Sequence, residues 1–246
     1  MTADIYEIFN SVQGEGPYVG VRQVFVRFMG CPLTCTYCDS REAFERSNKA
    51  KIDCRGITYE EVNPLTSSKL SKIVQSLWTS STKHITLTGG EPLLYPDFIS
   101  ELSSTCREPF YLETNAIFWQ QAEQIKDIID IAACDVKLPE HRSSLDYTTL
   151  LKNELKTIKI FNDCGISVFV KMIVMRETRR ESLIAPLIAL SEINPDLLLV
   201  LQPVTPLNRK TFPPSNKQLL ELMDTAGNYL NYIRLIPQVH KQLELK

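Results

Sequence analysis

The sequence predicts an α/β fold, an open or partial parallel β/α barrel of about six units. Two observations lead to this prediction. Short runs of β-branched and apolar residues recur along the chain, and stretches with apolar residues at helical spacing lie between them. Near-continuous apolar strands that alternate with amphipathic helices are typical of a parallel sheet covered by helices.

The expected elements follow one another in a regular order. The predicted strands are residues 23–28, 84–88, 110–114, 131–138, 168–175, 197–202 and 232–236. The predicted helices are residues 70–78, 119–129, 151–161 and 183–188, with a last helix that begins near Ser215. Residues 39–68 interrupt this order with a polar stretch, in which we expect a short helix or hairpin over the site. Without a linker or an internal repeat, residues 1–246 are expected to form a single domain.

Charge and hydropathy limit the partners. The formal net charge is −2, and Lys and Arg are scattered rather than clustered, so no nucleic-acid partner is expected. The longest apolar runs, such as 197–201, have the length of strands, which predicts no membrane partner. The N-terminus shows no secretory signal. We therefore expect a cytoplasmic protein that acts on a small molecule.

Three of the seven cysteines, Cys31, Cys35 and Cys38, lie within the eleven residues "GCPLTCTYCDS". A tetrahedral zinc or a closed iron–sulfur cluster takes four protein ligands. A compact set of three therefore indicates a metal centre with one open position. The other four cysteines are far apart and are expected to be ordinary core or loop residues rather than disulfide partners: Cys54, Cys106, Cys134 and Cys164.

Five polar or glycine-rich stretches follow predicted strands. Because the carboxyl ends of parallel strands meet at one rim of a barrel, we expect these stretches to converge there. The glycines of "GGEP" are open to two interpretations, a plain strand-to-helix turn or a close approach of a ligand to the backbone. The stretches are the cysteine motif, "TGGEP" (88–92), "ETN" (113–115), "DVK" (135–137) and "QPVTP" (202–206).

The motif CxxxCxxC, with Tyr37 before the third cysteine and GGEP after the next strand, resembles the radical S-adenosylmethionine superfamily. The resemblance implies a 4Fe-4S cluster on Cys31, Cys35 and Cys38, whose fourth iron is chelated by S-adenosylmethionine. It also implies an external one-electron donor, such as a flavodoxin or ferredoxin, and a 5′-deoxyadenosyl radical. The residues implied to contact S-adenosylmethionine are Tyr37, Cys38, Asp39, Gly90, Glu91, Asp135, Val136, Lys137, Gln202, Pro203, Val204 and Thr205.

The flanking segments resemble one family, the 7-carboxy-7-deazaguanine synthases, across nearly the whole chain. The resemblance rests on 7–31, which contains "QGEG", on "CDS" (38–40), "TLTGGEPLL" (86–94), "ETN" (113–115) and "RLIPQVHK" (234–241). It implies a homodimeric lyase of queuosine and deazapurine biosynthesis. The implied reaction converts 6-carboxy-5,6,7,8-tetrahydropterin to 7-carboxy-7-deazaguanine by radical ring contraction with loss of ammonia.

A flat heterocycle that carries a carboxylate needs a cation with bidentate geometry, amide or carboxylate groups for its ring nitrogens, and close backbone groups. We assign the carboxylate to Arg27, and at the end of the chain the terminal carboxylate of Lys246, more than its side chain, to the pterin. The alternatives are a solvated Arg27, a loop charge at Glu15 and a frayed terminus. The expected substrate residues are Val12, Gln13, Gly14, Glu15, Arg27, Thr88 and Lys246.

Ser40 directly follows the cysteine motif and has two possible roles. It is expected to be a ligand of Mg²⁺ that also touches the substrate, since Mg²⁺ prefers hard oxygen ligands. The alternative is a helix cap, a position at which serine is strongly favoured.

Two departures from the family pattern leave other functions open. Members often have glycine where this chain has Ala116, and a Ser-Pro-Lys type stretch where it has 135–137. The second departure partly resembles enzymes that install glycyl radicals, so one alternative is an activase that acts on another protein's backbone. The other is a non-catalytic metal-binding module with Cys54 or a histidine as fourth ligand.

Overall fold

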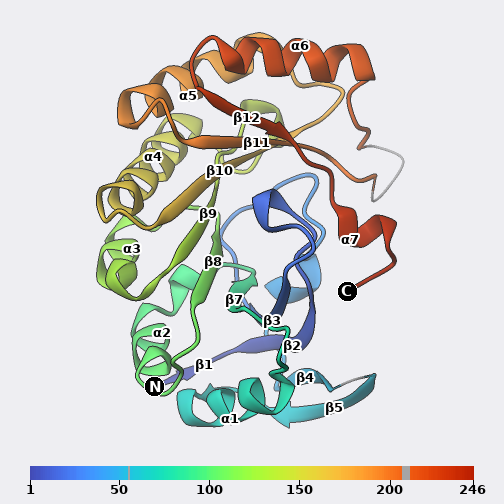
Figure 1. The fold of residues 1–246 in the computed structure, drawn as a ribbon, viewed down its shortest axis with the longest axis vertical. Coiled ribbons are helices and arrows are strands. Elements are labelled where there is room, and N and C mark those ends of the chain that lie inside the picture. The colour runs from blue at the N-terminus through green and yellow to red at the C-terminus, as the bar shows by residue number, and fades with distance from the viewer. Residues whose placement is uncertain (55, 207–210) are drawn as a thin grey trace.

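The computed structural model describes residues 1–54, 56–206 and 211–246. Within them, seven strands form a parallel sheet in which each hydrogen-bonds to the next (Figure 1). These strands are β3 (Arg22–Phe28), β7 (His84–Gly89), β8 (Phe110–Thr114), β9 (Ile131–Asp135), β10 (Ser167–Val174), β11 (Leu198–Pro203) and β12 (Tyr232–Leu235). Each one corresponds to a strand predicted from the sequence.

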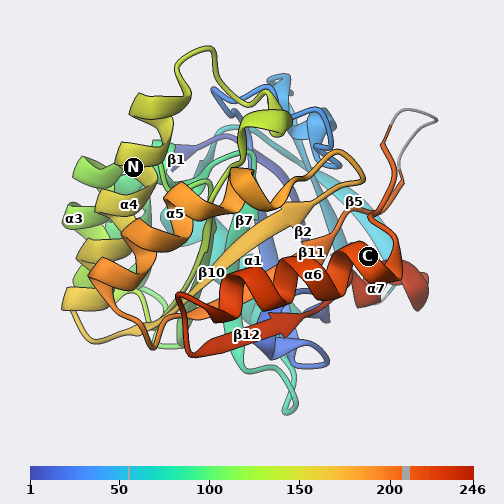
Figure 2. The same cartoon turned by 90° about the horizontal axis from the view of Figure 1, so that it is seen from above.

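Six helices follow the first six of these strands in chain order, which gives the predicted six units. They lie along the outer side of the curved sheet (Figure 1 and Figure 2). The helices are α1 (Ser67–Leu77), α2 (Pro96–Ser103), α3 (Trp119–Ile125), α4 (Tyr147–Asp163), α5 (Arg180–Ile193) and α6 (Asn216–Gly227). The predicted partial β/α barrel is therefore confirmed, and α2 is the one of the six that the apolar pattern missed.

Polar side chains begin several of these helices. Thr66, Asp146 and Ser215 each accept a hydrogen bond from a backbone N–H in the first turn of α1, α4 and α6. Such caps satisfy donors that have no partner inside the helix. Short 3-10 turns complete the connections: η1 (Gly16–Tyr18), η2 (Arg41–Phe44), η3 (Pro92–Leu94), η4 (Lys126–Ile128) and η5 (Pro139–His141).

Three further strands extend the sheet beyond β3. β2 (Ile5–Val12) runs antiparallel to β3, and β4 (Lys49–Cys54) and β5 (Ile57–Val62) form a hairpin beside β2. The sequence pattern missed β2 and left 39–68 open between a helix and a hairpin. The structure contains both, because η2 precedes the hairpin. β5 is almost wholly exposed, so no apolar alternation marks it in the sequence.

Three minor elements complete the described part of the chain. β1 (Thr2–Ala3) pairs with β6 (Leu65–Thr66), and α7 (Val239–Gln242) lies on the open side of the sheet, across from the helical layer (Figure 1). None of the helices in the described part of the chain is long and apolar enough to cross a membrane.

Alternate residues of the central strands face the inside of the barrel, and their character changes along each strand. Tyr111 of β8 and Phe169 of β10 belong to an apolar cluster inside the barrel, with Tyr18 packed against it. Two positions further along the same strands, Glu113 and Lys171 face the same side. The carboxyl ends of the strands therefore carry the polar groups, as expected for the functional rim of such a barrel.

Candidate active site

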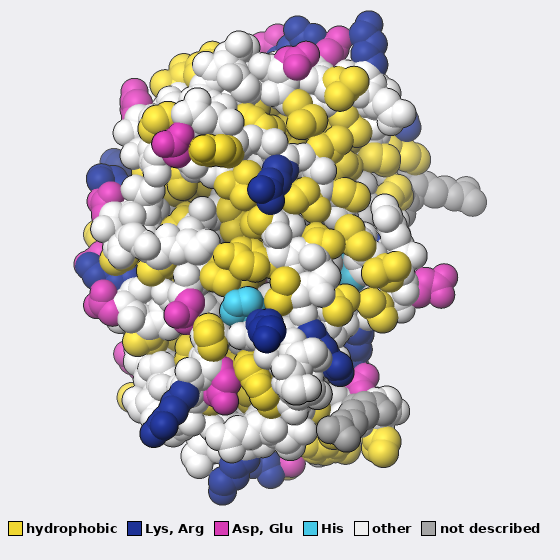
Figure 3. Space-filling view, in the orientation of Figure 1, with side chains coloured by type: hydrophobic (Ala, Val, Ile, Leu, Met, Phe, Trp, Pro, Cys, Tyr) yellow, Lys and Arg dark blue, Asp and Glu magenta, His cyan; other side chains and the backbone are white. Residues whose placement is uncertain are grey.

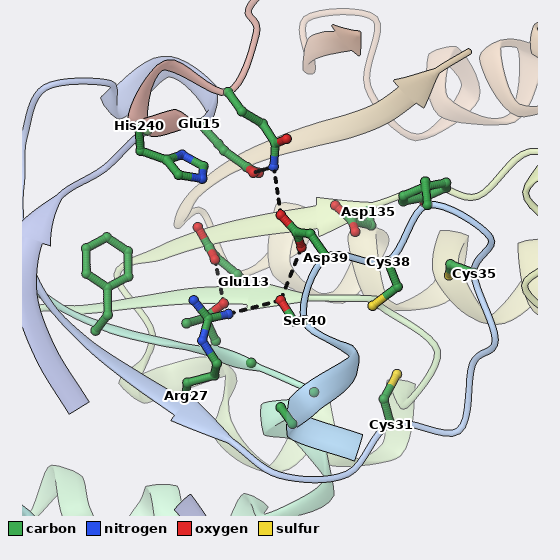
Figure 4. A pocket seen from close by; sticks show the side chains of 18 of the residues that line it. Glu15, Arg27, Cys31, Cys35, Cys38, Asp39, Ser40, Glu113, Asp135 and His240 are labelled. Carbon is green, nitrogen blue, oxygen red and sulfur yellow. Dashed lines mark hydrogen bonds between the residues drawn. The ribbon is translucent and has the colours of Figure 1, made fainter. Parts of the chain in front are cut away.

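A cavity of about 480 Å³ lies at the carboxyl ends of the parallel strands, which is a size typical of small-molecule sites (Figure 4). All five predicted stretches contribute to its wall. Three predicted residues, Glu91, Val136 and Pro203, do not line it. The predicted residues that do are Val12, Gln13, Gly14, Glu15, Arg27, Cys31, Cys35, Tyr37, Cys38, Asp39, Ser40, Thr88, Gly90, Asp135, Lys137, Gln202, Val204, Thr205 and Lys246.

The three clustered cysteines lie together at one end of this cavity (Figure 4). All three are free thiols, and Cys31 and Cys38 point toward one another. The side-chain amide of Asn115 donates to the sulfur of Cys31 at 3.6 Å, and the hydroxyl of Ser143 lies 3.0 Å from the sulfur of Cys35. Burial raises the pKa of Cys31 to about 11, so its thiolate needs a nearby positive charge, which a bound metal supplies.

The donor set fits an iron–sulfur cluster. Three soft sulfur ligands converge on one end of a cavity, and hydrogen-bond donors surround the sulfurs, as is usual for such clusters. Among the described residues, no group of three or more His, Cys, Asp and Glu side chains is arranged to hold a single metal ion. Cys54, the alternative fourth ligand, packs against the main hydrophobic core and is absent from the cavity wall.

The two glycines of "GGEP" allow the cysteine loop to approach β7. A Cβ atom on Gly90 would lie 2.1 Å from the carbonyl oxygen of Gly30, and one on Gly89 would lie 2.5 Å from the backbone of Phe28. Gly89 also has a φ of 114°, which favours glycine. A close contact between two parts of the chain therefore requires these glycines, a role that the sequence interpretation did not include.

Glu91 is buried and holds neighbouring loops. Its carboxylate accepts hydrogen bonds from the backbone N–H of Leu93 (2.9 Å) and Asn115 (2.8 Å) and from the hydroxyl of Thr114 (2.7 Å). Burial raises its pKa to about 7, against the opposing effect of these donors. Its carboxylate is directed at the chain itself and sets the position of the loop after β8. The predicted contact of Glu91 with the cofactor stays a prediction.

Ala116, a position at which the sequence departs from the expected family pattern, has a φ of 60°. This left-handed region favours glycine over residues with a Cβ atom. Alanine therefore adopts this backbone conformation at the cost of some strain.

A network of charged side chains crosses the middle of the cavity. The Nζ atom of Lys171 lies 2.5 Å from Oε2 of Glu15 and 3.4 Å from Oδ1 of Asp135, and Nζ of Lys137 lies 2.6 Å from Oδ2 of Asp135. Burial alone would raise the pKa values of Glu15 and Asp135, but the lysines outweigh it and hold both pKa values below the usual range. Both carboxyl groups are therefore ionised in the folded protein.

Two members of this part of the site were missed by the sequence interpretation. Lys171 stands in the otherwise apolar run "VFVKMIVM", and a lone lysine in a buried strand is a signal that could have identified it. Glu113 belongs to "ETN", one of the five stretches expected at the rim, and accepts hydrogen bonds from Gln13 (2.9 Å) and Thr88 (2.6 Å). Burial outweighs the nearby Lys171 and raises the pKa of Glu113.

Arg27 lies at the other end of the cavity and is held in place rather than solvated. Its Nε donates to Glu7 at 3.0 Å, and one Nη donates to the hydroxyl of Ser40 at 3.1 Å (Figure 4). Its guanidinium also lies over the ring of Phe9. Ser40 begins η2 without capping it through its side chain, so the alternative role as a helix cap is not observed.

The C-terminal segment covers the cavity from the side of the loop that contains "QGEG". The N–H of Val239 donates to the carbonyl of Gly14, and the Nδ1 of His240 lies where a side chain on Gly14 would project. Gln238 donates to Glu15 at 2.6 Å. The sequence interpretation of Gly14 as a substrate contact did not include this docking of the C-terminal segment.

The last residue is packed against the cavity wall rather than frayed. Nζ of Lys246 lies 3.0 Å from Oε2 of Glu7 and 5.1 Å from the centre of the Phe9 ring. Because Glu7 also holds Arg27, the two ends of the chain meet at the assigned carboxylate site. The side chain of Lys246 thus has a defined ionic partner, and the predicted contact of its carboxylate with substrate stays a prediction.

A partial parallel barrel with three cysteines at the carboxyl ends of its strands defines a class of enzymes. Residues 25–184 match the profile of the Radical SAM superfamily, so the chain belongs to it, and membership implies a 4Fe-4S cluster and S-adenosylmethionine. Within it, the chain belongs to the 7-carboxy-7-deazaguanine synthase family. It is 37% identical to the synthase of Methanocaldococcus jannaschii over 97% of this chain and 98% of that one. It is 34% identical to the synthase of Geobacter sulfurreducens over 97% of this chain and 96% of that one.

Solved structures show the same fold. QueE from Escherichia coli has a TM-score of 0.62 at 19% identity, covering 98% of this chain and 95% of that one. A radical SAM methyltransferase from Sphaerobacter thermophilus has a TM-score of 0.61 at 12% identity, covering 87% and 66%.

The charge network predicts a large cost for removing its central cation. Lys171→Met should lower the free energy of unfolding by about 3 kcal/mol at pH 8, because Glu15 and Asp135 lose a buried partner. The loss should shrink at pH 5. Without Lys171 the folded-state pKa of Glu15 rises above its unfolded value, because Lys171 is the cation that opposes the effect of burial there, whereas Asp135 keeps its pair with Lys137. Protonation of Glu15 therefore favours the folded state as the pH falls.

Denaturant titrations at the two pH values measure this effect. The matched control is Lys159→Met, which removes an exposed pair with Asp163 on α4 and should change stability little at either pH. Equal losses in the two variants would show that the network of Lys171 does not stabilise the fold.

Proposed function

We propose that this chain converts 6-carboxy-5,6,7,8-tetrahydropterin to 7-carboxy-7-deazaguanine and ammonia. The observation that carries the proposal is the full-length similarity to 7-carboxy-7-deazaguanine synthases, combined with one cavity that has three cysteines at one end and a fixed arginine at the other. Anaerobically reconstituted protein, given S-adenosylmethionine, a reductant and the pterin, should form both 5′-deoxyadenosine and 7-carboxy-7-deazaguanine. Formation of 5′-deoxyadenosine without the deazaguanine would retain the superfamily chemistry and reject this substrate.

The cysteine end is proposed to hold the 4Fe-4S cluster through Cys31, Cys35 and Cys38, with S-adenosylmethionine beside it. When bound, this pair of cofactors supplies a radical that abstracts hydrogen from the substrate. Asp39, Asp135 and other polar residues of the wall are proposed to hold S-adenosylmethionine. The protein thereby orients the reacting groups and separates them from water.

The opposite end is proposed to hold the pterin. Arg27 offers a guanidinium whose orientation is fixed by Glu7, which suits a carboxylate. Glu15 and Glu113 can accept hydrogen bonds from the amino and ring N–H groups of a pterin, and Gln13 can do so through its amide oxygen. These acceptors and Arg27 match the polar edges of one flat heterocycle.

The three thiolates are predicted to be the only protein ligands of the cluster. Alanine at Cys31, Cys35 or Cys38 should abolish both the cluster's absorbance and the cleavage of S-adenosylmethionine, because each removes one ligand. Alanine at the other four cysteines should retain both, since none of them lines the cavity. Loss of the absorbance in Cys54→Ala would instead indicate a fourth thiolate ligand.

Arg27→Lys is predicted to reduce turnover of the pterin by tenfold or more, about 1.4 kcal/mol, because lysine keeps the charge but lacks the planar fork. Binding of S-adenosylmethionine, measured by calorimetry, should be nearly unchanged. If binding of both ligands were equally weakened, Arg27 would be a structural residue.

A Mg²⁺ ion bound through Ser40 and the substrate is also proposed. The Ser40 hydroxyl faces the cavity between Arg27 and Oδ1 of Asp39, which lies 3.2 Å away, and oxygen ligands of this kind suit Mg²⁺. Ser40→Ala should abolish the stimulation of turnover by Mg²⁺ while leaving the cluster's absorbance intact. Retention of a normal Mg²⁺ response would remove Ser40 from the metal site.

The electron donor is proposed to be a flavodoxin or ferredoxin. In support, Pro32 and Thr34 of the cysteine loop are exposed, so a partner can come close to the cluster. Replacing a chemical reductant by a reduced flavodoxin should sustain turnover.

The protein is proposed to act as a homodimer. β12 is an edge strand of the sheet and Tyr232 on it is 58% exposed. Figure 3 shows hydrophobic side chains gathered over β11 and β12, a feature typical of contact surfaces. Light scattering in solution should give twice the chain mass, and the chain mass alone would reject the dimer.

A further inference from the structure

Residues 138–143, which follow β9, pack along the cysteine loop (30–40), and we call this segment the brace. The backbone N–H groups of Thr34 and Thr36 donate to the carbonyls of Ser143 (3.2 Å) and His141 (3.1 Å). The two segments are therefore bonded to each other on both sides of Cys35. None of these brace residues was expected from the sequence to have a role.

His141 makes this brace rigid. Its ring is buried, which lowers its pKa to about 3 and keeps it neutral. The Leu138 N–H donates to Nδ1 at 2.9 Å, so Nε2 carries the proton and donates to the carbonyl of Ile173 at 2.9 Å. The ring also meets that of Tyr37 edge-on at 4.7 Å. Both nitrogens thus have partners, and the orientation of the brace is determined.

The brace places the hydroxyl of Ser143 against the sulfur of Cys35. The Oγ and Sγ atoms are 3.0 Å apart, and the two residues are only 4% and 8% exposed. A thiolate bound to iron has no proton, so the hydroxyl must donate in the loaded protein. The amide of Asn115 makes a similar but longer contact, 3.6 Å, with the sulfur of Cys31.

We infer that Ser143 is a positioning residue that tunes the cluster: its hydroxyl donates a hydrogen bond to the Cys35 thiolate and raises the cluster's reduction potential. The inference rests on the cluster ligation proposed above. Hydrogen bonds to ligand sulfur withdraw negative charge and so favour the reduced cluster, which carries one more electron. That single electron comes from the external donor, and Ser143 neither forms nor breaks a covalent bond.

Two variants of Ser143 with side chains of equal shape separate the effect of the hydroxyl from the effect of side-chain size. Ser143→Thr keeps the hydroxyl, whereas Ser143→Val replaces it by a methyl group of similar size. Thr34→Val is the control, because the Thr34 hydroxyl donates to the carbonyl of Arg142 at 3.3 Å in the same brace without contacting sulfur. Each protein is reconstituted anaerobically, its iron and sulfide are measured, and its midpoint potential is titrated without substrate.

The potential of Ser143→Val should be more negative than that of the parent, whereas those of Ser143→Thr and Thr34→Val should match the parent. Equal potentials for the Val and Thr variants at 143, or an equal shift in Thr34→Val, would overturn the inference. If Ser143→Val holds too little iron to titrate, resonance Raman spectra of the loaded fraction decide. Iron–thiolate stretching frequencies shifted from those of Ser143→Thr support the hydrogen bond, and unchanged frequencies reject it.

Different results would contradict the proposed function and the proposed role of Ser143. Absence of iron and sulfide from the reconstituted parent would reject the cluster ligation itself. Because the titration needs no pterin, a failure to form 7-carboxy-7-deazaguanine leaves the measured potentials, and the inference drawn from them, intact.

Discussion

The close packing of the cysteine loop on the ends of the parallel strands is the contact on which the site depends. Gly90 meets the carbonyl of Gly30 at a distance that leaves no room for a side chain. On its other side the loop is bonded to the segment that contains His141 and Ser143. The contacting residues lie in the connections that follow β3, β7 and β9, so the positions of the three thiolates are determined by the barrel rather than by the loop alone.

The charged network in the middle of the cavity is the second constraint. Lys171 joins Glu15 and Asp135, and both carboxyl groups stay ionised although they are largely removed from water. Buried charges of this kind are costly unless they are paired. Their pairing keeps polar groups in defined positions between the two ends of the cavity, where a cofactor and a polar heterocycle would have to lie next to each other.

The N-terminal strand and the C-terminal segment complete the wall together. Glu7 of β2 holds Arg27 and also pairs with Lys246, while Gly14 receives the C-terminal segment. The site therefore uses nearly the whole chain, from its first long strand to its last residue. This is consistent with a similarity to the synthases that extends over 97% of this chain rather than over the cysteine motif alone.

Local patterns in the sequence determined the parallel strands, five of the six helices behind them and the cysteine motif, because each depends on residues close together in the chain. The tertiary structure decided the rest. The antiparallel β2 and the exposed β5 lack a clear period. Gly90 and Glu91 have structural roles because they contact residues of other loops, Gly30 and Asn115 respectively. Glu15 is separated from Lys171 by 156 residues and from Gln238 by 223, so their contacts exist only once the barrel has formed. The spacing of apolar residues along the chain predicts which residues share a strand or helix. Contacts between residues that are far apart in the sequence depend on how the strands are arranged in space.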